Sequence, residues 1–209
     1  LARQTVPLKG VDGVPLESGS GETVSVVGES GCGKSTMARA ILNVQPVTKG
    51  RIVWQGRSLA DLDERQARAF RAAVQAVFQD PYSALDPRLT VGFSIAEPIR
   101  THALRQGAAV TERVAELLEL VGLTPNFAAR YPHELPGGQC QRVGIARALA
   151  SEPRLIIADE AVAALDVSIR AQIVNLLMGL QRQFGLSFLF ISHDMAVVER
   201  VSHRVAVMY

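Results

Sequence analysis

The chain has 209 residues, 48% of them hydrophobic, and a formal net charge of +2. This size and hydrophobicity predict one folded domain, alone or with a small subdomain, and exclude a disordered chain. The small charge argues against a nucleic-acid-binding protein, the two cysteines argue against a disulfide framework, and no apolar run approaches the roughly 20 residues that a membrane span requires.

A glycine-rich loop follows the first predicted strand. Thr23–Val27 form an apolar run that predicts a buried strand, and Ser35–Leu42 predict a helix. The segment between them fits the pattern G-x-x-x-x-G-K-[ST], whose backbone N–H groups surround the phosphates of a nucleoside triphosphate. A chance match in a Gly/Ser-rich turn is the alternative, but a strand before the loop and a helix after it argue against chance. The expected nucleotide-binding residues are Gly28, Glu29, Ser30, Gly31, Cys32, Gly33, Lys34, Ser35 and Thr36.

Two residues of this loop carry its chemistry. The Lys34 ammonium group supplies a positive charge for the β- and γ-phosphates. The Ser35 hydroxyl is an oxygen ligand of the kind that Mg²⁺ prefers. The loop therefore predicts a nucleoside triphosphate and Mg²⁺ as ligands.

Further strand-like runs alternate with helix-like segments along the chain. Strands are expected at Arg51–Trp54, Val74–Phe78, Leu155–Ala158, Ser187–Ile191 and Val205–Met208. Helices are expected at 61–73, from 111 to a stop at Gly122, and at 168–183. This alternation predicts an α/β fold with a mainly parallel sheet. Because residues 80–150 lack strand signals, we expect them to form a helical subdomain inserted into a core of residues 1–79 and 151–209.

Two adjacent acids follow the strand predicted at Leu155–Ala158. A parallel sheet binds ligands at the carboxyl ends of its strands, which is where these acids would lie. Asp159 could there hold Mg²⁺, usually through water, and Glu160 could take a proton from an attacking water. The alternative is an ordinary acidic turn, which the phosphate loop in the same chain argues against.

A second segment suited to phosphate lies before the helical run Val143–Leu149. It consists of Pro136, Gly137, Gly138 and Gln139. Two glycines at a helix start expose backbone N–H groups and the positive end of the helix dipole. Two such surfaces in one chain suggest that two chains close on one triphosphate.

The order of these motifs resembles that of the ATP-binding-cassette (ABC) ATPases, and the resemblance covers essentially the whole chain. It rests on the phosphate loop, Gln79, the Gly-Gly-Gln segment, the Asp-Glu pair, Ala164-Leu165-Asp166 and His193. The segment Val77–Arg88 is similar to that of importers of dipeptides, oligopeptides and nickel. The resemblance implies the ABC ATPase fold, a P-loop NTPase core of the RecA-like type with an inserted helical subdomain.

The resemblance also implies a function and partners. The chain would be the ATP-hydrolysing subunit of a peptide importer, at the cytoplasmic face of the cell membrane. Its partners would be integral membrane permease subunits, a second ABC ATPase in a head-to-tail dimer and, indirectly, an extracytoplasmic peptide-binding protein, with no nucleic acid.

In that dimer each expected site residue has an implied role. ATP and Mg²⁺ would lie between the phosphate loop of one subunit and residues 136–139 of the other. Gln79 would contact Mg²⁺ and the attacking water, and Glu160 would be the base. His193 would contact the γ-phosphate, and Asp166 would lie at the dimer seam. Lys34 completes the expected catalytic set.

Several positions depart from the family's usual pattern. Pro136 stands where the family has serine, so a hydroxyl and an N–H that would face the γ-phosphate are missing. Because a hydrogen bond to a charged group contributes about 1.5–3 kcal/mol, we expect this half-site to be weakened about 10- to 100-fold.

Ala161 replaces a proline with little expected effect, and Ala163 replaces a serine that would contact the partner. No aromatic residue precedes Trp54, so the family's adenine-stacking side chain is absent or lies upstream of this chain.

Two other functions stay open at this stage. The chain could be a regulatory subunit that holds ATP as a clamp, since Pro136 alters one composite site. It could also be a soluble ABC ATPase acting on DNA or ribosomes, although its small charge and the segment 79–88 argue against this.

The solute stays open between dipeptides, longer peptides and nickel, as does the identity of the second ATPase. Both ends read as cut, so we expect a longer polypeptide.

Overall fold

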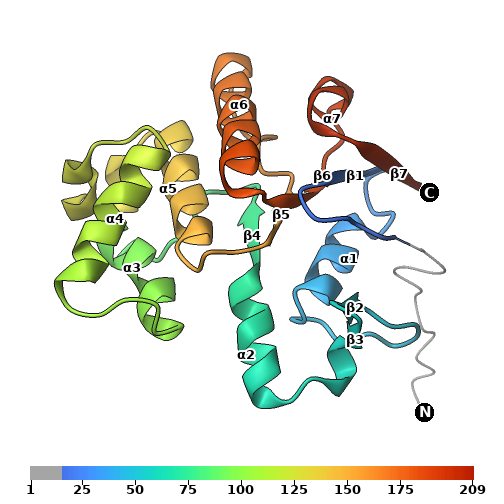
Figure 1. Ribbon diagram of the computed structural model, residues 1–209. Helices are drawn as coiled ribbons and strands as arrows, with labels where there is room; N and C mark the ends of the chain where they lie inside the picture. Colours follow the sequence, from blue (N-terminus) through green and yellow to red (C-terminus); the bar gives the residue numbers. More distant parts are fainter. Residues whose placement is uncertain (1–15) are drawn as a thin grey trace, which may run out of the picture.

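The computed structural model describes residues 16–209, which contain a parallel sheet of five strands with helices on both faces (Figure 1). The strand order is β4-β5-β6-β1-β7, and all neighbouring strands in it are parallel. The expected α/β fold with a mainly parallel sheet is confirmed. The strands are β1 (Thr23–Gly28), β4 (Val74–Phe78), β5 (Leu155–Asp159), β6 (Ser187–Ile191) and β7 (Arg204–Met208).

The central strands are buried on both faces, as strands of a covered parallel sheet are. One face packs against α1 (Lys34–Ile41) and α2 (Glu64–Ala73), and the other packs against α6 (Val167–Phe184) and α7 (Met195–Val201). Figure 1 shows α6 and α7 above the sheet and α1 and α2 below it. Alternate residues of a strand therefore enter different cores. In β5, for example, Ile156 lies in the α6 core and Ile157 in the α1 core.

The strand expected at 51–54 does not join this sheet. Only β2 (Val53–Trp54) is extended there, and it pairs with β3 (Arg57–Ser58) in a separate antiparallel hairpin. The Trp54 ring meets the Phe70 ring of α2 edge-on, with centroids 5.7 Å apart. The hairpin thus covers part of the α1 face instead of extending the sheet.

The helix expected to start at residue 61 starts three residues later. Asp63 caps α2: its carboxylate accepts from the Gln66 N–H, and the Gln66 side chain accepts from the Asp63 N–H. This reciprocal pair satisfies two N–H groups at the helix start. Leu59–Asp61 form a short 3-10 helix instead.

Between β4 and β5 the described chain is helical. It forms α3 (Val91–Thr101), α4 (Ala108–Leu120), 3-10 helices at Pro125–Ala129 and Pro132–Glu134, and α5 (Gly137–Leu149). The expected apolar stripe of α4 is buried, although the helix begins at Ala108 and not at 111. Neither α3, which contains Pro98, nor the seven-residue α7 was predicted as a separate helix from the sequence. The division of the chain near residues 80 and 150 stays a prediction.

In the described part of the chain, no helix combines the length and the apolar character that crossing a bilayer requires.

Gly28 provides a test of the β1–β7 pairing. A Cβ added there would lie 2.2 Å from the Met208 carbonyl oxygen, and this backbone atom of β7 has little room to move. We expect Gly28→Ala to cost about 1–3 kcal/mol and to lower Tm by roughly 2–4 °C for each kcal/mol. Gly179→Ala in α6 is the control, because a Cβ there meets nothing within 4 Å. Thermal unfolding without nucleotide measures both variants, and equal Tm values would contradict the tight β1–β7 approach.

Candidate nucleotide-binding site

The expected site residues lie where parallel strands end side by side. β1, β6 and β5 are adjacent in the sheet, and their register pairs Val26 with Ile191 and Ile191 with Asp159. Because the carboxyl ends of these strands share one edge, the loops that follow them share it too. The loop 28–36, the acids after β5 and His193 after β6 are therefore neighbours.

The loop 28–36 curls around the end of the Lys34 side chain. Lys34 is only 8% exposed, and its Nζ donates to the carbonyl oxygens of Gly28 at 2.8 Å and Glu29 at 2.7 Å. Gly33, at a φ of 103°, precedes α1 in the left-handed conformation that glycine adopts readily. The first N–H groups of α1 have no carbonyl partner within the helix, so this end suits an anion.

Ser35 and Asp159 meet at the base of the loop. The Ser35 hydroxyl donates to Asp159 Oδ1 at 3.2 Å, joining the first turn of α1 to the end of β5. Burial raises the pKa of the Asp159 carboxyl, and the nearby Glu160 carboxylate raises it further. A cation placed here would offset both effects.

The donor set at Ser35 and Asp159 fits magnesium. Mg²⁺ is usually held by one or two protein oxygens together with phosphates and water. Within residues 16–209 no group of three or more His, Cys, Asp or Glu side chains forms a ready metal cage. A hydroxyl beside one carboxylate, next to a loop suited to phosphate, is the smaller set that Mg²⁺ bound to a nucleotide requires.

Glu160 and His193 form a pair across the ends of β5 and β6. The His193 Nδ1 lies 2.9 Å from Glu160 Oε1 and 2.7 Å from Oε2. The Glu160 side chain is 18% exposed and that of His193 is 67% exposed, so the pair is open to solvent on the histidine side. Since a carboxylate can only accept, Nδ1 is the donor, and the histidine's Nε2 is left for another group.

Glu160 also has an unusual backbone conformation. Its φ is 53°, in the left-handed region that residues other than glycine seldom occupy. Its N–H donates to the Ile191 carbonyl at 2.9 Å, which holds the turn against β6. Strained residues of this kind cluster at functional sites. The sequence alone gave no sign of this conformation.

Gln79 lies on the same edge of the sheet but stands apart from these pairs. It follows β4, whose last residue Phe78 is paired with Asp159. Gln79 is exposed, and within residues 16–209 its side chain makes no hydrogen bond. Its expected contact with Mg²⁺ and water stays a prediction.

Residues 136–139 begin α5, away from the phosphate loop. Pro136 precedes the helix, and its carbonyl accepts from the Gln139 and Cys140 N–H groups. A Cβ on Gly138 would lie 2.6 Å from Ile169 Cγ2, so a glycine is needed where α5 meets α6. No hydrogen bond or ion pair in the described part of the chain joins residues 136–139 to residues 28–36.

Gln139 and Asp166, two further expected site residues, lie at the starts of α5 and α6. The Gln139 Oε1 is buried without a hydrogen-bond partner in the described residues. Asp166 is exposed at the start of α6, where its carbonyl accepts from the Arg170 N–H. Both positions are compatible with contacts to a second chain, and their roles stay predictions.

Two residues that hydrogen-bond to the turns around the site, Arg170 and Gln141, were not predicted from the sequence. Arg170 donates to Asp194 Oδ2 at 2.5 Å and to the Leu165 carbonyl at 3.1 Å, joining the turn before α6 to the residue after His193. Gln141 donates to the carbonyl oxygens of Phe78 and Ala161. The only sequence signal for Gln141 was a polar residue on an otherwise apolar helix face.

The sequence of the chain is similar to those of known ABC transporter proteins. The chain matches the family model described as ABC transporter over residues 11–163. It is 56% identical over 207 residues to the glutathione import ATP-binding protein GsiA of Salmonella paratyphi A, covering 99% of this chain and 33% of that protein. The GsiA protein of Escherichia coli K12 is 57% identical over 209 residues, covering 100% and 34%. The chain thus spans about a third of the length of these curated relatives.

Solved structures agree with the family match. The fold is similar to that of MJ0796, an ATP-binding cassette in a dimeric post-hydrolysis state with ADP and Pi (TM-score 0.83, 32% identity, covering 95% of this chain and 86% of that one). It is also similar to cbiO1 from Clostridium perfringens, part of the ABC transporter complex cbiONQ (TM-score 0.83, 26% identity, covering 95% and 78%). The resemblance noted in the motifs is confirmed, and the chain belongs to the ABC transporter family.

Proposed function

We propose that this chain binds ATP with Mg²⁺ and hydrolyses the ATP as the nucleotide-binding part of an ABC importer at the cytoplasmic face of the membrane. The observation that carries the proposal is the convergence of two polar pairs beside Lys34. Ser35 meets Asp159, and Glu160 meets His193, at the ends of adjacent parallel strands. A site for phosphate thus lies next to a carboxylate able to accept a proton.

In the proposed reaction, water attacks the γ-phosphorus of ATP. Glu160 accepts the water's proton, the bond from the γ-phosphorus to the β–γ bridging oxygen breaks, and ADP and phosphate leave. His193 holds the carboxylate of Glu160 in place through Nδ1. Lys34 and the loop N–H groups offset the negative charge of the phosphates. Mg²⁺ at Ser35 and Asp159 would supply further positive charge, with Gln79 as an additional ligand.

The proposed partners are inferred from residues 136–139, which are expected to bind the phosphates of a nucleotide held by another chain. Among the described residues, no hydrogen bond or ion pair joins residues 136–139 to residues 28–36 of the same chain, which supports a head-to-tail dimer in which they cover the ATP of a second ABC ATPase, with Asp166 at the seam. The similar cassette MJ0796 is a dimer bound to ADP and Pi, which supports a dimer here. Integral membrane permease subunits and, indirectly, an extracytoplasmic peptide-binding protein would complete the importer.

The proposed solute is a peptide. The two curated relatives are glutathione import proteins by name, and glutathione is a tripeptide. Because segment 77–88 is similar to that of importers of peptides and of nickel alike, the choice of a peptide rests on these relatives alone.

A second candidate function is that of a nucleotide clamp. Pro136 offers neither an N–H nor a hydroxyl at the start of α5, so it makes no side-chain capping hydrogen bond there. A composite site covered by this segment would hold ATP less well aligned for attack. ATP would then persist there while a partner's intact segment supports hydrolysis at the other site.

Replacement of the proposed base tests the main proposal. We expect Glu160→Gln to lower ATP turnover by about 10²- to 10⁴-fold, the usual contribution of a general base, while ATP binding persists. The measurement is steady-state phosphate release by the full-length protein assembled with its permease. Glu119→Gln on α4, an exposed carboxylate, is the matched control. Unchanged turnover in the Glu160 variant would reject the assigned base.

Restoring the missing donors tests the clamp. We expect Pro136→Ser to raise turnover by about 10-fold or more, because one hydrogen bond to a charged group contributes about 1.5–3 kcal/mol. Pro125→Ser, an exposed proline of a 3-10 helix, is the control. Counting ATP molecules hydrolysed per dimer in a single turnover separates the candidates. Equal hydrolysis at both sites of the unaltered protein excludes the clamp.

A further inference from the structure

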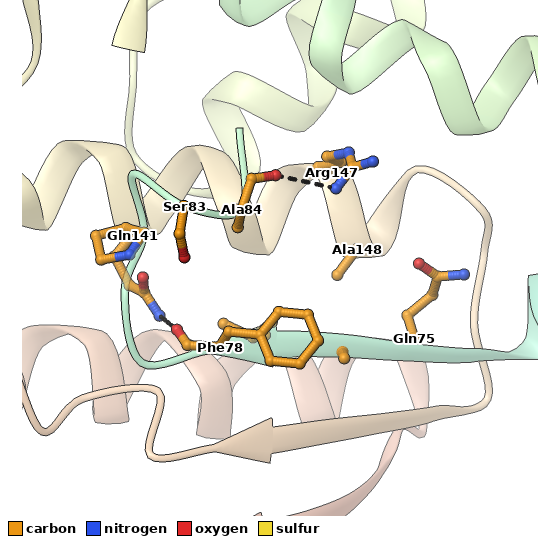
Figure 2. A pocket seen from close by; sticks show the side chains of 11 residues that line it. Gln75, Phe78, Ser83, Ala84, Gln141, Arg147 and Ala148 are labelled. Atoms are coloured by element: carbon orange, nitrogen blue, oxygen red, sulfur yellow. Dashed lines mark hydrogen bonds between the residues drawn. The ribbon is translucent and has the colours of Figure 1, made fainter. Parts of the chain in front are cut away.

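One buried amide connects the start of α5 to both loops that carry proposed catalytic residues. Gln141 is 1% exposed, and its Nε2 donates to the Phe78 carbonyl at 3.2 Å and to the Ala161 carbonyl at 2.6 Å. Phe78 directly precedes Gln79, and Ala161 directly follows Glu160. Figure 2 shows the Gln141 side chain pointing at the Phe78 carbonyl.

The orientation of this amide is fixed by its chemistry. A primary amide has two N–H hydrogens, and both are used when Nε2 faces two carbonyl oxygens. The flipped amide would set its own oxygen against two acceptors in a buried site, which is costly. Gln141 therefore holds the two carbonyls at a fixed separation.

Helix geometry links this amide to residues 136–139. Gly137 and Gly138 lie four and three residues before Gln141, so they share its side of α5 and are about one turn away. Gly138 packs closely on Ile169 of α6. Because α5 is one continuous helix from Gly137 to Leu149, a shift of its start would reach Gln141 and, through the two hydrogen bonds, the end of β4 and the turn after β5.

A groove beside this contact leaves α5 room to shift. It has a volume of about 440 Å³, lies between β4 and α5, and is lined by Gln75, Phe78, Gln141, Arg147 and their neighbours. Arg147 donates to the Ala84 carbonyl at 3.2 Å (Figure 2). Apolar residues of α5 pack in the core on its other side, so on the side of the groove the contacts to the sheet edge include the hydrogen bonds of Gln141.

We propose that Gln141 is a positioning residue that couples closure of residues 136–139 on a partner's ATP to the placement of this chain's own Gln79 and Glu160. The inference rests on the proposed function, because it requires a second chain whose nucleotide these residues cover. When the start of α5 is drawn to that nucleotide, Gln141 moves the Phe78 and Ala161 carbonyls together. Each site then becomes competent only when the other is occupied, so ATP hydrolysis is cooperative.

The test compares Gln141→Met with the unaltered full-length protein in its transporter. Methionine keeps the length and volume of the side chain and removes both donors. We expect kcat to fall by about 10- to 100-fold, since misplacing catalytic groups by about 1 Å costs on this order. The Kd for ATP should change less than about twofold, and the Hill coefficient for ATP should fall from above 1 to about 1.

A matched control comes from a second helix glutamine. Gln181 of α6 donates through Nε2 to the Gly21 carbonyl at 3.1 Å and to Thr23 Oγ1 at 2.8 Å, away from both catalytic loops. Gln181→Met removes the same pair of donors, so we expect a loss of Tm with kcat and the Hill coefficient unchanged. Equal kinetic losses in the two variants would reduce Gln141 to a structural role and overturn the proposal.

A shorter amide keeps the proposal testable should the methionine variant not fold. Gln141→Asn keeps a buried amide but lacks the reach to span both carbonyls, and we expect the same loss of kcat and cooperativity. If either folded variant retains wild-type kcat and Hill coefficient, the coupling role is wrong while the proposed function stands. If the unaltered transporter fails to hydrolyse ATP, the proposed function fails and this inference fails with it.

Discussion

The register of three parallel strands is the constraint on which the candidate site depends. β1, β6 and β5 end together, so Lys34, His193 and the acids Asp159 and Glu160 reach one edge of the sheet although they are far apart in the chain. A shift by one residue in any strand would turn its side chains to the other face. The apolar cores on both sides of the sheet hold the register, and their stability is thereby linked to the geometry of the site.

Part of the candidate site could be predicted because its signals are local, whereas Gln79, His193 and Asp166 were expected only from the resemblance to ABC ATPases. A strand, a glycine-rich loop and a helix in succession identify the loop 28–36, and an apolar run ending in two acids identifies Asp159 and Glu160. The main strands were predictable for the same reason, since each is a short apolar run. The hairpin at Val53–Trp54 was not predicted, because the segment resembles a sheet strand locally and only its pairing with Arg57–Ser58 sets it apart. The start of α2 was placed too early, because Asp63 and not Asp61 is the capping residue.

Residues that brace the site were not predictable, because their partners are distant in sequence. Gln141 bonds to carbonyls 63 and 20 positions away, and backbone carbonyls carry no side-chain signal. Arg170 and Asp194 are 24 positions apart. The left-handed backbone of Glu160 likewise results from the tie between its N–H and β6. These contacts join the ends of the strands to α5 and α6, and Pro136 is where the start of α5 departs from the family's usual pattern.

The contact of Lys34 with the phosphates of a nucleotide is the interaction on which the proposed function most depends. Its most direct test is the equilibrium affinity of the full-length protein for ATP with Mg²⁺, compared between Lys34→Ala and the exposed control Lys49→Ala. Loss of a charge-assisted contact to phosphate should weaken binding by about tenfold or more in the Lys34 variant and leave the Lys49 variant unchanged. Equal affinities for the two variants would contradict the assignment of the site.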